Sequence, residues 1–222
     1  MAGKVRAEVQ VSAGPVIMFA HLLAIVLTIL VFVWVFHFRE GLAFRSKNKF
    51  KIFNIHPLLM VVGFVLMVGE ALMAYKTVPA VKQRQKFVHM LLNLIALITG
   101  ILGIYAVFKY HIEADIPDLY SLHSWIGIST ICLFVIQWLL AFFTFMYPKA
   151  EHSKRARFAP WHVLFGILIF FMAIISAITG LVEKFIFLNL GRSQEGLVVN
   201  FTGLLLLLFG VSVLLTLLFH KY

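Results

Sequence analysis

The sequence predicts an all-α integral membrane protein with six transmembrane helices. Of its 222 residues, 62% are hydrophobic and only 13% are charged, whereas a soluble domain has about 25% charged residues. The mean hydropathy is +1.00. The apolar residues form long uninterrupted runs, which are typical of membrane-spanning helices. They do not alternate with the period of two that a transmembrane β-barrel requires.

Six apolar runs account for this fold class. Each has about 20 residues or more, which is enough for a helix to cross a hydrocarbon core of about 30 Å. The polar segments between the runs are short, so we expect residues 1–222 to form a single transmembrane domain. The runs are Val16–Phe36, His56–Tyr75, Phe87–Phe108, Leu122–Tyr147, Trp161–Val182 and Leu197–Phe219.

The flanks of these runs support their assignment as spans. The first run is too long for the apolar part of a signal peptide, and it is followed by His37 and Arg39 instead of a small-residue cleavage site. The second to fifth runs each have a histidine at or near their start. The sixth run returns the chain to the face from which it began, so both termini are expected on one side of the membrane.

The net charge of +10 reflects membrane topology and does not predict a nucleic-acid partner. The Lys and Arg residues cluster between the apolar runs, where loops meet lipid headgroups. The two termini and the loops at 76–86 and 148–160 hold 11 of the 19 basic residues, which favours cytosolic termini. The first loop, with five basic residues, opposes this orientation, and the acidic third loop supports it. The single cysteine, Cys132, excludes a disulfide within the chain.

Four histidines recur in one structural position, at or near the start of the second to fifth helices. His56, His89, His123 and His162 are separated by 33, 34 and 39 residues, about one span plus one loop. Because consecutive helices run in opposite directions, the starts of the second and fourth helices share one membrane face. The starts of the third and fifth share the other. The spacing therefore predicts two pairs in a central four-helix bundle, His56 with His123 and His89 with His162.

Two imidazoles that face each other across a bundle are suited to bind a six-coordinate haem iron. Each neutral ring offers one nitrogen to the metal, and a hydrogen-bonding partner fixes the other nitrogen. With both axial positions filled, no site is left for oxygen, so electron transfer is the natural role. The alternative is that each histidine caps a helix or meets headgroups. Four histidines at matched depth favour the haem interpretation, because an ionisable group inside a membrane is costly unless it is paired or used.

Two other functions remain compatible with these residues. A haem b membrane anchor that exchanges electrons with a quinone or a partner subunit would use the same histidines. A lipid-soluble quinone, however, does not need basic residues beside them, whereas an anionic donor does. A haem-free transporter or scaffold is the third interpretation. Transporters favour helices broken at the bilayer midplane, whereas the prominent polar groups of this chain lie at helix ends.

The sequence around the histidines resembles the eukaryotic cytochrome b561 family. The resemblance covers nearly the whole chain, and YSLHSW combined with four correctly spaced histidines is specific. The matching motifs are FNIHP (53–57), KFVH (86–89), YSLHSW (120–125), PWH (160–162), HFREGL (37–42) and GLVEK (180–184).

The resemblance implies a six-helix protein with cytosolic termini, often a homodimer, that holds two haem b groups. His56 and His123 would bind the non-cytosolic haem, and His89 and His162 the cytosolic haem. It also implies an ascorbate-dependent transmembrane oxidoreductase, which takes an electron from cytosolic ascorbate and passes it to monodehydroascorbate or a ferric chelate on the other side. Vacuolar, endosomal-vesicle and plasma membranes all fit, and the sequence does not choose between them.

Ascorbate is a small anion at neutral pH, so its site has to be cationic and beside a haem edge. Lys82 and Lys86 precede His89 by seven and three residues, which puts both near the helical face of that histidine. Arg155 precedes His162 by seven residues, across a proline, and we expect it in a loop. In the family, basic residues that match Lys82, Lys86 and Arg155 hold ascorbate. Without the resemblance, positive-inside charge would explain them equally well.

Three residues on the opposite face match the family's non-cytosolic substrate site, namely Tyr110, His111 and Tyr120. Tyr120 lies three residues before His123, so it can cover the haem edge. An interfacial belt of aromatic residues is the alternative. His111 can change protonation near neutral pH, which suits proton-coupled electron transfer. Deep in the second helix, Glu70 has to face the bundle interior or an aqueous path.

Overall fold

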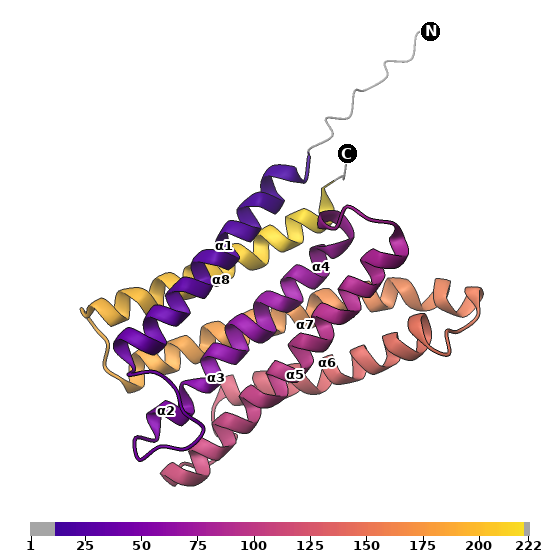
Figure 1. Ribbon diagram of the computed structural model, residues 1–222. Coiled ribbons are helices and arrows are strands. Elements are labelled where there is room, and N and C mark those ends of the chain that lie inside the picture. Colours follow the sequence, from indigo (N-terminus) through magenta and orange to yellow (C-terminus); the bar gives the residue numbers. More distant parts are fainter. Residues whose placement is uncertain (1–11, 220–222) are drawn as a thin grey trace.

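The computed structural model describes residues 12–219, and within this range the chain is helical without β-strands. Six helical stretches of the described chain are long and apolar enough to cross a membrane. They lie side by side in one elongated bundle (Figure 1). The predicted all-α fold with six membrane-spanning helices is therefore confirmed.

Several of the spans are built from more than one helical segment. π-Helical turns, labelled η, end the first and fourth spans and interrupt the second, where Pro57 lacks an N–H to donate along the helix. The segments are α1 (Gly14–Val33), η1 (Trp34–Phe38), α2 (Phe50–Phe53), α3 (Ile55–Leu58), η2 (Leu59–Leu66), α4 (Met67–Thr77), α5 (Lys82–Ala114), α6 (Leu122–Ala141), η3 (Phe142–Met146), α7 (His152–Phe187) and α8 (Gln194–Leu218).

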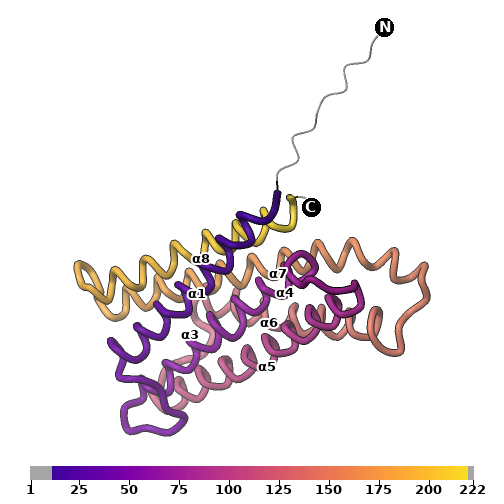
Figure 2. Tube along the Cα trace, turned by 45° about the horizontal axis from the view of Figure 1, so that its top comes forward, coloured from indigo at the N-terminus to yellow at the C-terminus, as the bar shows by residue number. Residues whose placement is uncertain are grey.

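The second to fifth spans form a central four-helix group, and the first and sixth pack together beside it. Helix α4 and segment η2 lie along α5, α6 lies along α7, and α1 lies along α8. Figure 2 shows the same pairing from another side. The start of α1 and the end of α8 lie at one end of the bundle (Figure 1). We call this end the terminal face and the opposite end the far face.

Helices α5 and α7 are longer than the apolar runs that predicted them. Helix α5 has 33 residues and α7 has 36, because their polar ends continue the backbone hydrogen bonds beyond the apolar part. Helix α7 also continues through Pro160, since a proline removes one helical hydrogen bond without necessarily ending the helix. The expectation that Arg155 lies in a loop was therefore wrong. It lies in α7, two helical turns before His162.

Polar contacts fix the first loop and the helix starts at the far face. The buried Asn54 side chain donates to the carbonyl oxygens of Arg39 at 2.9 Å and Gly41 at 2.7 Å. Gly41 has a φ of +86°, which glycine adopts without strain. Ser121 caps α6 in a reciprocal capping box with Ser124. These contacts set where the second and fourth spans begin, and hence the depth of His56 and His123.

Two polar clusters hold the two ends of α8, one to the end of the first span and the other to α4. At the far face, Glu195 at the start of α8 accepts from Trp34 Nε1 at 2.8 Å and Arg39 Nε at 2.6 Å. At the terminal face, Lys76 Nζ donates to the carbonyl oxygens of Thr216 at 2.5 Å and Leu217 at 3.0 Å, at the end of α8. A cation at these otherwise unpaired carbonyls is favourable because they form the negative end of the helix dipole.

Glu70 lies between α4 and α1, where its carboxylate pairs with a histidine. Its Oε1 is 2.9 Å from His21 Nδ1, and the Glu70 side chain is 21% exposed. From the sequence, Glu70 was expected to face the bundle interior or an aqueous path, and no partner was assigned to it. The pairing was missed because nothing in the sequence indicates that the first helix packs against the second at this level.

Candidate functional site

Two cavities open at opposite ends of the central helices. The terminal-face cavity has a volume of about 790 Å³ and lies between the ends of α4 and η3 and the starts of α5 and α7. The far-face cavity, of about 490 Å³, lies between the start of the second span, the end of α5, the start of α6 and the end of α7. All ten residues proposed from the sequence line one of these cavities.

His56 and His123 meet in the far-face cavity. Their ring centroids are 6.1 Å apart, and the ring planes cross at 85°. Each ring is fixed through Nδ1, which donates to a carbonyl oxygen of a neighbouring helix: Gly103 at 3.0 Å for His56, and Ser176 at 2.8 Å for His123. A Cβ at Gly180 would come within 2.7 Å of the His123 ring, so only glycine leaves room for the ring there.

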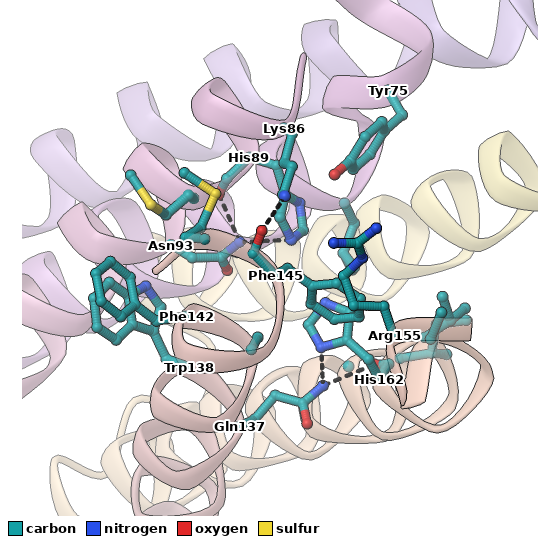
Figure 3. A pocket seen from close by; sticks show the side chains of 18 of the residues that line it. Tyr75, Lys86, His89, Asn93, Gln137, Trp138, Phe142, Phe145, Arg155 and His162 are labelled. Atoms are coloured by element: carbon teal, nitrogen blue, oxygen red, sulfur yellow. Dashed lines mark hydrogen bonds between the residues drawn. The ribbon is translucent and has the colours of Figure 1, made fainter. Parts of the chain in front are cut away.

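His89 and His162 meet in the terminal-face cavity with similar geometry. Their centroids are also 6.1 Å apart, and the planes cross at 80°. His89 Nδ1 donates to the carbonyl oxygen of Ala71 at 2.7 Å. Figure 3 shows the two rings reaching into one space from α5 and α7. The structure therefore brings together both histidine pairs that the spacing indicated.

His162 differs from the other three histidines because its Nδ1 meets a side chain. The Gln137 amide nitrogen lies 3.0 Å from Nδ1 and 2.7 Å from the His162 carbonyl oxygen (Figure 3). In this orientation the amide donates to Nδ1. If a metal binds Nε2, the proton of the ring resides on Nδ1, and the amide then has to turn its oxygen toward the ring.

The geometry of both pairs fits a haem iron between the rings. A metal–nitrogen bond of about 2 Å on each side, added to the distance from each nitrogen to its ring centre, accounts for a separation near 6.1 Å. In three of the rings the hydrogen bond from Nδ1 selects the tautomer whose lone pair is on Nε2. At His89 the Asn93 amide nitrogen lies 3.4 Å from that Nε2 atom. The cavities are also of the size usual for small-molecule and cofactor sites, about 300–1,000 Å³.

The terminal-face cavity is lined by cations without a counter-charge. Among the described residues that line it there is no Asp or Glu. Its charged residues are Lys76, Lys82, Lys86, Lys149 and Arg155. We call these five residues the cationic rim. A set of positive charges of this kind attracts small anions. Lys149, Lys76 and the nearby His152 had not been proposed as site residues.

Lys86 and Arg155 also hold the turn between η3 and α7. Lys86 Nζ donates to the carbonyl oxygen of Phe145, and Arg155 Nη1 donates to that of Ala150 at 3.0 Å. Figure 3 shows Lys86 close to His89 and Arg155 close to His162. The turn carries Lys149, whose φ is +70°. Lys86 and Arg155, which were expected to bind ascorbate, therefore also help to position Lys149.

The far-face cavity carries mixed charge. His111 Nδ1 lies 2.7 Å from Asp118 Oδ1, and Asp118, Glu183 and Lys184 line the cavity with it. Tyr110 is 7% exposed, whereas Tyr120 is 56% exposed. The two tyrosines therefore differ in placement: Tyr110 lies in the cavity wall, and Tyr120 lies at the surface.

Comparison with known proteins identifies the family. The model of the eukaryotic cytochrome b561 family matches residues 55–188, which contain all four paired histidines. This chain belongs to the eukaryotic cytochrome b561 family. A probable ascorbate-specific transmembrane electron transporter of Oryza sativa subsp. japonica is 46% identical over 208 residues, covering 91% of this chain and 89% of the relative.

Two further relatives of this cytochrome b561 come from Arabidopsis thaliana and Homo sapiens. A transmembrane ascorbate ferrireductase of Arabidopsis thaliana is 42% identical over 212 residues, covering 94% of this chain and 89% of that protein. A transmembrane ascorbate-dependent reductase of Homo sapiens is 40% identical over 202 residues, covering 88% and 79%. The cytochrome b561 family is haem-binding, in agreement with the chemistry of the two cavities.

An apolar partition separates the two cavities of this cytochrome b561. Phe64 lines the far-face cavity and Phe134 the terminal-face cavity. Their rings meet edge to face with centroids 5.0 Å apart, and both side chains are buried. Each ring lines one cavity and touches the other ring, so buried apolar side chains lie between the two sites.

Proposed function

We propose that this cytochrome b561 transfers single electrons across a membrane, from ascorbate at the terminal face to an acceptor at the far face, through two bis-histidine haem b groups. The terminal face is taken as cytosolic, as the distribution of basic residues suggests. The observation that carries the proposal is the pair of crossed imidazoles in each cavity, 6.1 Å apart. The family resemblance further supports a homodimer in a vacuolar, vesicular or plasma membrane.

His89 and His162 would hold one haem, and His56 and His123 the other. A haem held there would supply a one-electron ferric–ferrous couple. The protein residues orient the rings, since three of the four Nδ1 atoms donate to backbone carbonyl oxygens. Because a backbone carbonyl cannot be lost by a side-chain substitution, this support is intrinsic to the fold.

The cationic rim supports an anionic donor at the terminal face. Lys82, Lys86 and Arg155 would bind ascorbate, which loses one electron and one proton to become monodehydroascorbate. The Oryza and Arabidopsis relatives carry ascorbate in their names. A lipid-soluble quinone has no use for this excess of positive charge, so the quinone-linked anchor is the weaker alternative.

At the far face, Tyr110, His111 and Tyr120 would contact the acceptor. The reduction of monodehydroascorbate consumes one electron and one proton, whereas a ferric chelate takes one electron and becomes ferrous. His111 is held by Asp118, whose Oδ1 lies 2.7 Å from the ring Nδ1, and an imidazole ring can carry a proton. Its position favours a role in the proton-consuming reaction.

Between the cavities, Phe64 and Phe134 keep water and ions from crossing. An ion would have to leave water for a medium of low dielectric constant, at a cost of many kcal/mol. An electron can cross this apolar region without a bond being made. The partition therefore supports electron transfer without ion leakage.

The decisive experiment is an optical spectrum of the purified protein before and after addition of ascorbate, together with the haem-to-protein ratio. We expect two low-spin haems per chain, both reduced by ascorbate. A colourless preparation would refute the proposal. A haem protein reduced by a quinol, but not by ascorbate, would favour the quinone-linked alternative.

A further inference from the structure

One lysine in the far-face cavity is half-buried and has no oxygen partner among the described residues. Lys184 lies in the last turn of α7 and lines the cavity. Its ammonium lies 3.5 Å from the centroid of the Phe53 ring and 6.0 Å from that of Tyr110. No hydrogen bond or ion pair connects it to any described residue, and its neighbour Glu183 is not within ion-pair distance.

Each of the other described lysines either has an oxygen partner or is exposed to solvent. The partly buried ones all have oxygen partners: Lys49 and Lys109 pair with Glu113, Lys51 approaches Glu40, and Lys76 and Lys86 donate to backbone carbonyls. Those without partners, at positions 47, 82, 149 and 154, are exposed to solvent. Lys184 is the exception within the described chain.

Contact with aromatic rings does not satisfy an ammonium group. A cation–π contact uses the attraction of the ring face, but a lysine has three N–H donors, and a ring offers no lone pair to accept them. Removing an ammonium from water without an oxygen acceptor is costly. Phe53 and Tyr110 also touch each other, with centroids 5.3 Å apart, so they form a rigid support that fixes the direction of the lysine.

We propose that Lys184 binds an anionic oxygen of a ligand at the far-face cavity, with Phe53 and Tyr110 holding its ammonium in place. This inference rests on the proposed function. Two sources supply such an oxygen. One is a carboxylate at the edge of the bound haem, and the other is the electron acceptor, either monodehydroascorbate or the carboxylates of a ferric chelate. In both cases Lys184 supplies positive charge to a cavity that otherwise holds Asp118 and Glu183.

The test compares Lys184→Met, Lys184→Arg and Lys109→Met in membrane vesicles whose far face is exposed. Methionine keeps the unbranched shape that packs on the two rings but removes the charge, and arginine restores it. Lys109 is the matched control, since it lies near the same face, pairs with Glu113 and lines neither cavity. Ferricyanide and ferric citrate serve as anionic acceptors, and hexaammineruthenium(III) serves as a cationic acceptor.

If Lys184 binds the acceptor, Lys184→Met raises KM roughly tenfold for both anionic acceptors, as loss of one charge-assisted contact implies. The KM for hexaammineruthenium(III) does not rise, and both haem potentials are unchanged. If Lys184 binds the haem carboxylate, one haem potential falls and that haem transfers faster to apomyoglobin, while the anionic KM values stay the same. Lys184→Arg restores most of the wild-type value of whichever quantity Lys184→Met changes, the KM for anionic acceptors or the haem potential.

The proposal is overturned if Lys184→Met changes neither the KM for anionic acceptors nor a haem potential. It is also overturned if Lys109→Met changes these quantities equally. Where Lys184→Met does not accumulate in membranes, Lys184→Gln is measured instead. The haem-to-protein ratio and reduction by ascorbate are recorded for every variant. A wild-type protein with two ascorbate-reducible haems and insensitive Lys184 variants would refute this inference alone, whereas a haem-free wild type would refute the proposed function.

Discussion

The imidazole planes of His56 and His123 cross at 85° with their centroids 6.1 Å apart, and those of His89 and His162 cross at 80°. Bound to a ferric haem, rings crossed in this way would donate equally to the two dπ orbitals of the iron, which would leave these orbitals nearly degenerate. We therefore predict a highly anisotropic low-spin electron paramagnetic resonance signal from both oxidised haems. A rhombic spectrum of the kind given by parallel imidazoles would contradict the geometry.

Loss of one histidine should remove one haem and spare the other. In His123→Leu the far-face pair is broken, while His89 and His162 lie in a separate cavity beyond the aromatic partition. We expect the ratio of haem to protein to fall from two to about one, as measured by the pyridine haemochrome assay. His37→Leu, which alters a histidine that lines neither cavity, should keep both haems. Loss of both haems in His123→Leu alone would show that the two sites do not fill independently.

Removal of the Lys86 charge should weaken donor binding. Lys86→Met is expected to raise KM for ascorbate roughly tenfold, the effect of losing one charge-assisted contact of about 1.4 kcal/mol. The effect should shrink at high salt because ions screen the attraction. Lys154→Met provides the control, since this neighbouring lysine does not line the cavity. An equal effect in both variants would mean that general surface charge, and not a defined site, attracts the donor.

Gln137 should influence the terminal-face haem through His162. An acceptor at Nδ1 makes the ring a stronger donor to iron and stabilises the ferric state. We expect Gln137→Leu to raise the midpoint potential of one haem and Gln137→Glu to lower it, as followed by spectroelectrochemical titration. Gln83→Leu, a change in the same cavity that does not contact a histidine, should alter neither potential. A shift in the midpoint potential of the far-face haem instead would disprove the assignment of Gln137.

His111 should matter most for acceptors that take up a proton. His111→Ala is expected to slow reduction of monodehydroascorbate, because a proton donor beside the acceptor is lost. Reduction of ferricyanide, which needs no proton, should change less. Asp118→Asn keeps the ring but removes the carboxylate 2.7 Å away, and an intermediate effect is expected. Unchanged acceptor reduction in His111→Ala at every pH would rule out this role.

The sequence alone determined the spans and the histidine pairs, because both depend on local or periodic properties. A run of about 20 apolar residues has few alternatives to a membrane helix. Alternating helix direction then assigns His56 and His123 to one face by arithmetic alone. The cationic rim was partly visible too, since Lys82 and Lys86 precede His89 on the same helix.

Only the tertiary structure decided the contacts that connect different helices. His21 meets Glu70, and Lys184 lies on Phe53 and Tyr110, through packing between segments far apart in the chain. The hydrogen bonds that hold the four histidines also connect different helices, because each Nδ1 meets a group on the neighbouring antiparallel helix. Most of these partners are backbone carbonyls, which every residue carries, so no side-chain pattern in the sequence indicates them.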